Sequence, residues 1–139
     1  MRETKFKYFL DSNVVLYLLS GDSAKADKVE NLLVGGPVIS VQVLNEVTQV
    51  CRRKLRMNWD EITQFLELIR KFCKVVPLTE AVHDSARLIA ERHKLSFYDA
   101  CIVAAAAETG CQVLYSEDMN HGQRLEDGLS LQNPFNISR

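Results

Sequence analysis

The sequence predicts an α/β protein in which a central parallel β-sheet is sandwiched between layers of α-helices. Short apolar segments bounded by polar residues, glycine or proline alternate along the chain with longer segments of helical periodicity. Strands that are apolar on both faces need helices on both sides of their sheet. With 139 residues, 47% hydrophobic residues and a net charge of −1, the chain suits one compact domain, which we place at residues 1–139.

The first half of the chain starts this alternation. Residues 6–10, F-K-Y-F-L, have the composition of a buried strand, and 13–19 form a short helix that S-G-D ends. Ser23 is placed to cap a second helix, which G-G-P breaks. The strand V-I-S follows at 38–40, and its helix, at 42–57, has apolar residues three and four positions apart.

The second half repeats the pattern. Helices are expected at 60–73, 80–93 and 96–110, and strands at 74–78, 111–116 and 129–131. Ser96 opens the last of these helices and Gly110 closes it. Two helices, at 23–33 and 60–73, carry larger apolar faces than a small core needs.

Several classes of protein are excluded by simpler features. The first apolar run is too short for a signal peptide, and no segment reaches the length of a membrane span, so we expect a cytoplasmic protein with no membrane partner. The four cysteines have neither C-x-x-C spacing nor a nearby histidine, which indicates reduced core residues. The near-zero net charge provides no general attraction for nucleic acid but allows a local basic patch.

Four carboxylates stand where a parallel sheet binds ligands. Asp11 follows the first strand and Asp118 follows the strand at 111–116, while Glu46 and Asp99 lie near the starts of their helices. Ligands of such sheets bind beyond the carboxyl ends of the strands. We therefore expect these four residues to meet at one edge and to act as catalytic residues and metal ligands.

Each acid also has a structural interpretation. Asp11 is placed to cap the helix at 13–19, and Ser96-x-x-Asp99 matches a capping box. Glu46 suits a solvated position beside an apolar stripe, and Asp118 suits a turn. Their common position at one edge favours a shared site, and Asp99 lies on the apolar face of its own helix rather than on the solvent face.

A cluster of carboxylates needs protons or cations to offset its repulsion. Mg²⁺ and Mn²⁺ prefer oxygen ligands, and such ions assist phosphoryl chemistry by neutralising phosphate charge and acidifying water. The expected cofactor is therefore Mg²⁺ or Mn²⁺, and the expected activity is metal-dependent phosphoryl chemistry.

Four segments, taken in order, resemble the PIN-domain family, most closely the VapC-type ribonuclease toxins of toxin–antitoxin pairs. They are F-L-D-S-N-V at the amino terminus, S-V-Q-V-L-N-E-V around Glu46, F-Y-D-A-C-I-V-A-A-A around Asp99, and L-Y-S-E-D-M at 114–119. The resemblance covers about residues 7 to 135. It implies a PIN-like fold and an endoribonuclease that cleaves single-stranded or loop RNA with Mg²⁺ or Mn²⁺.

The resemblance also implies site residues and partners. Asp11, Glu46, Asp99 and Asp118 match the family's acids, and Asn13 and Ser116 match accessory polar positions. Glu117, next to Asp118, remains an alternative or additional acid. A cognate antitoxin and a homodimer are expected, with the antitoxin bound partly through the helices at 23–33 and 60–73.

Other functions fit the residues less well. A haloacid-dehalogenase-like phosphatase needs a second acid two residues after Asp11, where this chain has Asn13. A receiver domain needs an aspartate after the third strand, and K-V-V-P-L-T has none. A catalytically inactive PIN-like module that binds RNA or protein remains an alternative. Arg53, about 10 Å beyond Glu46 along the same helix side, is a possible RNA phosphate contact.

Overall fold

The computed structural model describes residues 6–136, which form a five-stranded parallel sheet with strand order β3-β2-β1-β4-β5. Every adjacent pair of strands is parallel. The strands are β1 (Tyr8–Leu10), β2 (Val38–Ser40), β3 (Lys74–Val76), β4 (Val113–Tyr115) and β5 (Ser130–Gln132). The predicted fold class, a central parallel sheet between helices, is confirmed.

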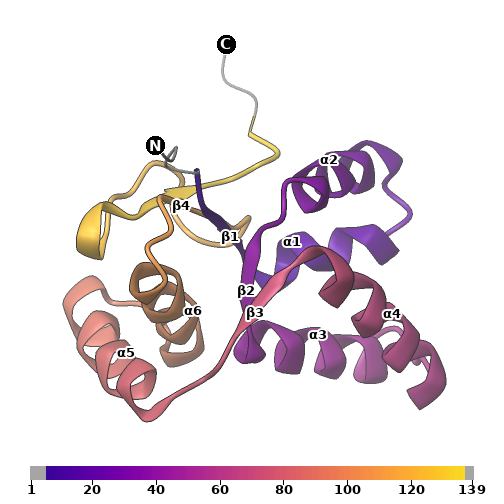
Figure 1. Ribbon diagram of the computed structural model, residues 1–139, viewed down its shortest axis with the longest axis horizontal. Coiled ribbons are helices and arrows are strands. Elements are labelled where there is room, and N and C mark those ends of the chain that lie inside the picture. The colour runs from indigo at the N-terminus through magenta and orange to yellow at the C-terminus, as the bar shows by residue number, and fades with distance from the viewer. Residues whose placement is uncertain (1–5, 137–139) are drawn as a thin grey trace, which may run out of the picture.

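Helices cover both faces of this sheet (Figure 1). They are α1 (Ser12–Leu16), α2 (Ser23–Val34), α3 (Val41–Arg53), α4 (Trp59–Phe72), α5 (Glu80–His93) and α6 (Phe97–Glu108), with short 3₁₀ helices η1 (Tyr17–Leu19) and η2 (Glu126–Gly128). Figure 1 shows α1–α4 on one side of the sheet and α5 and α6 on the other. This division follows from right-handed crossovers, because the chain crosses the sheet in one direction from β1 to β3 and then returns to β4.

Because the chain passes from β3 to the other side of β1, the sheet has a topological switch point between β1 and β4. These neighbouring strands pair in register, with Leu10 opposite Tyr115, and the backbone N–H of Asp11 donates to the Tyr115 carbonyl at 3.0 Å. The chain leaves β1 toward one half of the sheet and enters β4 after covering the opposite face. The carboxyl ends of these two strands therefore form the crevice where open α/β sheets bind ligands.

The core lies on both faces of the sheet. Phe9, Leu10, Ile39 and Leu114 have no exposed surface. Helix α6 packs against β2 and β4, and its residues 100–106 are all buried. Its run of alanines lets α5 and α6 approach closely, since small side chains keep the two backbones near each other. A rigid α6 in turn fixes the position of its first turn.

Within residues 6–136, no helix combines the length and the apolar character needed to cross a membrane.

Several predicted element boundaries were wrong. The strands expected at 6–10, 74–78 and 111–116 are shorter, at Tyr8–Leu10, Lys74–Val76 and Val113–Tyr115, and the strand expected at 129–131 is shifted to Ser130–Gln132. The helix expected to reach residue 57 ends at Arg53, and the chain then turns through Arg56, which has a left-handed φ of 57°. The cap of α2 is Asp22 instead of Ser23, because the Asp22 carboxylate accepts the Lys25 N–H at 3.2 Å. Helix α4 starts earlier than expected, because a complete capping box ties Asn58 to Glu61.

Candidate functional site at the carboxyl edge of the sheet

Asp11 is a buried carboxylate at the switch point, with 3% of its surface exposed. Its Oδ1 accepts the backbone N–H of Ser12 at 2.7 Å, so it does cap the short helix α1, as one of its structural interpretations predicts. Its Oδ2 accepts the Ser116 hydroxyl at 2.8 Å and, more weakly, the Asn13 amide at 3.4 Å. The partners of this carboxylate are therefore neutral donors.

The pKa of Asp11 is raised from 3.8 to about 7. Burial is the main cause, because it disfavours the charged form. The bonds from Ser116 and Ser12 oppose this rise, whereas the charges of Glu46 and Asp99 add to it. At neutral pH, this carboxyl is consequently poised between its neutral and charged forms, and a nearby cation would favour the charged form.

Glu46 reaches the same edge from the second turn of α3. Its Oε1 accepts the Ser12 hydroxyl at 2.7 Å, and its Oε2 accepts the Gln42 side-chain amide at 2.9 Å. The Ser12 hydroxyl also lies 3.4 Å from Asp11 Oδ1. Ser12 thus links the first and second acids, which are far apart in the sequence.

Asp99 comes from the first turn of α6 and is half-buried. Burial raises its pKa, the Ser96 hydroxyl lowers it, and the charges of Glu46 and Asp118 raise it further. The predicted capping box is only half formed in the described structure: the Ser96 hydroxyl accepts the Asp99 N–H at 3.2 Å, without the return bond that completes the box at Asn58. The carboxyl of Asp99 therefore lies close enough to Ser96, Glu46 and Asp118 for all three to shift its pKa.

Glu117 and Asp118 are adjacent but have different surroundings. Glu117 accepts the Tyr17 hydroxyl at 2.5 Å and forms an ion pair with Lys25 at 2.7 Å, which lowers its pKa. Asp118 is exposed, and its charge acts on Asp99. The structure places Glu117 against α2 and η1, and it places Asp118 with the other acids.

Asn13 and Ser116 hold the backbone just after β4, where Glu117 and Asp118 lie. The Asn13 side-chain carbonyl accepts the Glu117 N–H at 3.1 Å, and the Ser116 hydroxyl accepts the Asp118 N–H at 3.3 Å while it donates to Asp11. Ser116 is almost fully buried. One hydroxyl therefore joins the ends of β1 and β4.

The four acids differ from the structure's paired carboxylates in one respect. Within residues 6–136, none of Asp11, Glu46, Asp99 and Asp118 forms an ion pair with a basic side chain. In their present conformations, no group of three or more histidine, cysteine, aspartate or glutamate side chains in this part of the chain is arranged to hold a metal ion. The acids share one edge and act on one another electrostatically, and the carboxylates of Asp11 and Glu46 accept hydrogen bonds from neutral hydroxyl and amide groups.

Two polar residues of the site were not predicted. Ser12 and Gln42 hold Glu46 in place, and Gln42 is buried despite its polar side chain. Its position four residues before Glu46 is a sequence signal for such a bond, since these positions are neighbours on a helix. The predicted RNA contact Arg53 is exposed at the last residue of α3.

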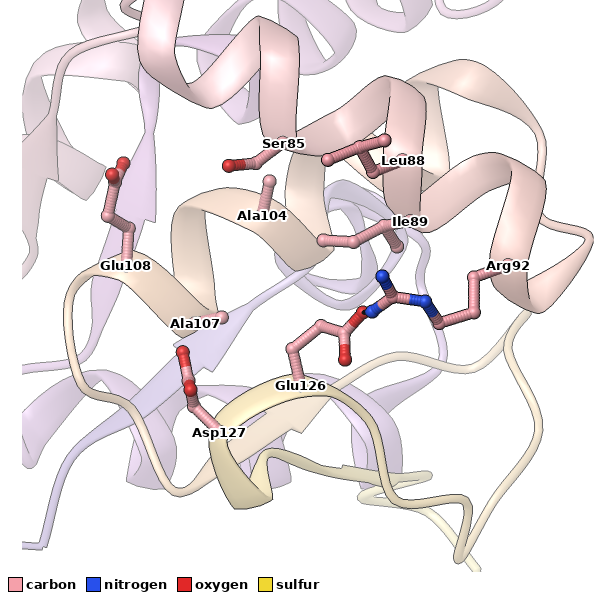
Figure 2. A pocket seen from close by; sticks show the side chains of 9 residues that line it. All are labelled: Ser85, Leu88, Ile89, Arg92, Ala104, Ala107, Glu108, Glu126 and Asp127. Carbon is pink, nitrogen blue, oxygen red and sulfur yellow. Dashed lines mark hydrogen bonds and ion pairs between the residues drawn. The ribbon is translucent and has the colours of Figure 1, made fainter.

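A separate hollow of about 380 Å³ lies among α5, α6 and η2 (Figure 2). Arg92 and Glu126 face each other across it and form an ion pair, and Ala104 and Ala107 line its base. None of the four candidate acids lines this hollow. Its carboxylate Glu126 also lies 3.5 Å from His93 Nε2.

The fold and the acidic edge together define an α/β domain with a ligand crevice between its first and fourth strands. The model of the PIN domain family matches residues 8–124, and the chain therefore belongs to the PIN domain family. The resemblance inferred from the four sequence segments is confirmed at this level. No relative among curated protein sequences matches the chain.

Several solved structures have the same fold. DNA-bound VapBC from Salmonella typhimurium is 17% identical, with a TM-score of 0.71 over 94% of this chain and 99% of that one. VapBC-1 from nontypeable Haemophilus influenzae is 22% identical, with a TM-score of 0.68 over 93% and 98%. VapC20 from Mycobacterium tuberculosis, a sarcin–ricin loop cleaving toxin, is 21% identical, with a TM-score of 0.66 over 81% and 90%.

Proposed function

We propose that this protein is a metal-dependent endoribonuclease that acts as the toxin of a toxin–antitoxin pair. One observation carries the proposal: four acids that have no basic partner among residues 6–136 lie at the switch point of a PIN-domain sheet, and two of them have raised pKa values. Titratable groups perturbed both by burial and by like charges are typical of functional sites. The neighbours that share the fold include VapBC complexes and a toxin that cleaves the sarcin–ricin loop.

The donor set fits Mg²⁺ or Mn²⁺. Carboxylates, hydroxyls and amide carbonyls are the hard oxygen ligands that these ions prefer. The pKa of Asp11 is raised mainly by burial and further by the charges of Glu46 and Asp99, and a bound cation would favour its charged form. Asp11, Glu46, Asp99 and Asp118 would hold the ion after their carboxylates turn from their present hydrogen bonds. When bound, such an ion neutralises phosphate charge and acidifies water.

The residues around the acids would keep the carboxylates in position for this chemistry. Ser116 and Asn13 hold Asp11 from one side, and Ser12 and Gln42 hold Glu46 from the other. Neutral donors suit this task, because a lysine or arginine in the same place would displace a cation. Arg53, at the far end of α3, would bind an RNA phosphate.

The expected protein partners are an antitoxin and a second copy of the chain. The helices predicted to bind them expose large apolar side chains: Val34 at the end of α2, and Leu68 and Phe72 on α4. Exposed apolar patches of this kind are common at protein interfaces. Light scattering at micromolar concentration should give the mass of a dimer, and a monomer would contradict the predicted homodimer.

Cleavage of single-stranded RNA by the purified protein tests the enzymatic proposal. We expect EDTA to abolish cleavage and Mg²⁺ or Mn²⁺ to restore it, with 5′-phosphate and 3′-hydroxyl ends on the products. Cyclic 2′,3′-phosphate ends would indicate attack by the RNA 2′-hydroxyl and would refute this mechanism. RNA binding without cleavage at any metal concentration would instead support the inactive binding module.

A further inference from the structure

A groove of about 590 Å³ begins at the acidic edge and runs along α3. Ser12 and Glu46 form its end at the acidic site, and the other wall comes from Tyr98, the residue before Asp99. Because the groove and the acids share Glu46, a molecule held in the groove would lie beside the candidate catalytic centre.

Helix α3 presents a row of amide side chains to this groove. Gln42, Asn45 and Gln49 line it, and their spacing of three and four residues places them on one face of the helix with Glu46. Gln42 is occupied by its bond to Glu46, whereas the Asn45 and Gln49 side chains are exposed and make no hydrogen bond within the described structure. Two free amides thus face the groove, each with donors and an acceptor.

Tyr98 supplies an aromatic surface on the opposite wall. Its side chain is 63% exposed, although it stands in the first turn of the buried helix α6. Phe97 packs against its ring at a centroid distance of 5.7 Å and contacts the core, so the Tyr98 ring is supported from behind. An exposed, supported aromatic ring beside an active centre is a stacking surface for a base.

The chemistry of the groove favours a nucleobase over a phosphate or a peptide. Among residues 6–136, no lysine or arginine lines it, so a phosphate would meet the carboxylate of Glu46 there and no positive charge from this part of the chain. The large exposed apolar residues that suit a protein partner lie instead on α2 and α4. Amides and an aromatic ring together match the polar edge and the flat face of an unstacked base.

We propose that this groove binds one base of single-stranded RNA next to the scissile phosphate, stacked on Tyr98 and hydrogen-bonded by Asn45 and Gln49. This inference rests on the proposed ribonuclease function and adds a base-binding subsite to it. Arg53 lies one turn beyond Gln49 on the same side of α3 and would bind the phosphate on the far side of that base.

A binding cycle tests the stacking contact without relying on cleavage. In an Asp11→Asn background with Mg²⁺, fluorescence anisotropy would compare a labelled oligoadenylate with an abasic ribose-phosphate oligomer of equal length. Adding Tyr98→Ala should weaken oligoadenylate binding by about tenfold or more, the usual effect of losing one base–aromatic stack. It should leave binding of the abasic oligomer unchanged, and Tyr98→Phe should restore most of the lost affinity.

Trp59→Ala provides the matched control, because Trp59 is a similarly exposed aromatic residue at the start of a different helix. Equal losses for Tyr98→Ala and Trp59→Ala would overturn the proposal, as would equal losses on both oligomers or no RNA binding at all. Selective loss of a protein partner by Tyr98→Ala, with RNA binding intact, would assign the groove to that partner. Failure of the wild-type protein to cleave RNA would refute the proposed function separately, since the binding cycle does not require cleavage.

Discussion

The buried and partly buried carboxylates of residues 6–136 occupy two kinds of environment. Around η2, Glu126 has Arg92 as an ion-pair partner and His93 beside it, and near η1, Glu117 is paired with Lys25. At the carboxyl edge of β1 and β4, Asp11 and Glu46 are held by neutral donors, which are hydroxyls, side-chain amides and one backbone N–H. The first kind has a basic partner, and the second has none in the part of the chain that the structure describes.

This difference separates structural acids from candidate functional acids more clearly than cavity shape does. The hollow in Figure 2 is well formed, but the carboxylate that faces Arg92 across it already has its counter-charge. The acidic edge leaves negative charge uncompensated at the crevice where the fold binds ligands. An acid that the protein leaves unpaired is available for an external cation.

The largest expected effect is that of Asp11→Asn. This variant keeps the size of the side chain and removes its charge, so we expect RNA cleavage to be abolished while circular dichroism shows an intact fold. If Asp11 serves only as the cap of α1, the variant will retain cleavage, and Asp11 is then a structural acid despite its lack of a basic partner among residues 6–136.

The same variant should change the pH dependence of stability in metal-free protein. A carboxyl whose pKa rises from 3.8 to about 7 on folding retains its proton in the native state, so stability falls as pH rises through that interval. Asp11→Asn removes this loss. Its stability should match the wild type near pH 4 and exceed it by a few kcal/mol above pH 7, since each pKa unit corresponds to about 1.4 kcal/mol. Denaturant unfolding in EDTA at both pH values measures the difference.

Asp118→Asn and Glu117→Gln compare the two environments in adjacent residues. The first should remove most of the cleavage rate with little change in melting temperature, because Asp118 is exposed and unpaired. The second should lower the melting temperature through loss of the Lys25 and Tyr17 bonds and should keep most of the activity. The opposite pattern would make Glu117 the fourth acid.

Asp99→Asn and Ser96→Ala separate chemistry from capping in α6. Ser96→Ala removes the hydroxyl that accepts the Asp99 N–H and should cost about 1 kcal/mol of stability without loss of cleavage. Asp99→Asn keeps that cap and should lose cleavage instead. Two active but destabilised variants would show that Asp99 serves only the helix end.

Glu126→Gln should have the smallest effect. Its partner Arg92 is mostly exposed, and ion pairs of this kind contribute up to about 1 kcal/mol. We expect unchanged cleavage and a small loss of stability in thermal unfolding. A large loss of cleavage would show that a paired acid outside the edge also matters.

The sequence was sufficient to predict the layers of the fold and the edge at which the acids meet. Apolar strands that alternate with helices allow few arrangements, and Asp11 and Asp118 each follow a strand directly. The partners of these acids were harder to predict, because Ser116 lies 105 residues from Asp11 and Lys25 lies 92 residues from Glu117. Only the paired strands bring such residues together.

Helix ends were the other source of error. The periodic sequence continues past Arg53, but the backbone leaves the helix there and turns at Arg56. Asn58 and Glu61 have the spacing of a capping box, and the prediction overlooked this signal in favour of Asp60 as the helix start. Where two local sequence patterns are equally strong, the packing of the whole chain decides where the helix begins or ends.

The pairing of β1 with β4 has a consequence for synthesis on the ribosome. Asp11 emerges early, but its hydroxyl partner Ser116 and the last acid, Asp118, belong to the final quarter of the chain. A nascent chain that has folded its first helices still lacks the strand that completes the crevice. If the proposed function is correct, the nuclease would stay harmless to the RNA around it until its translation is almost finished.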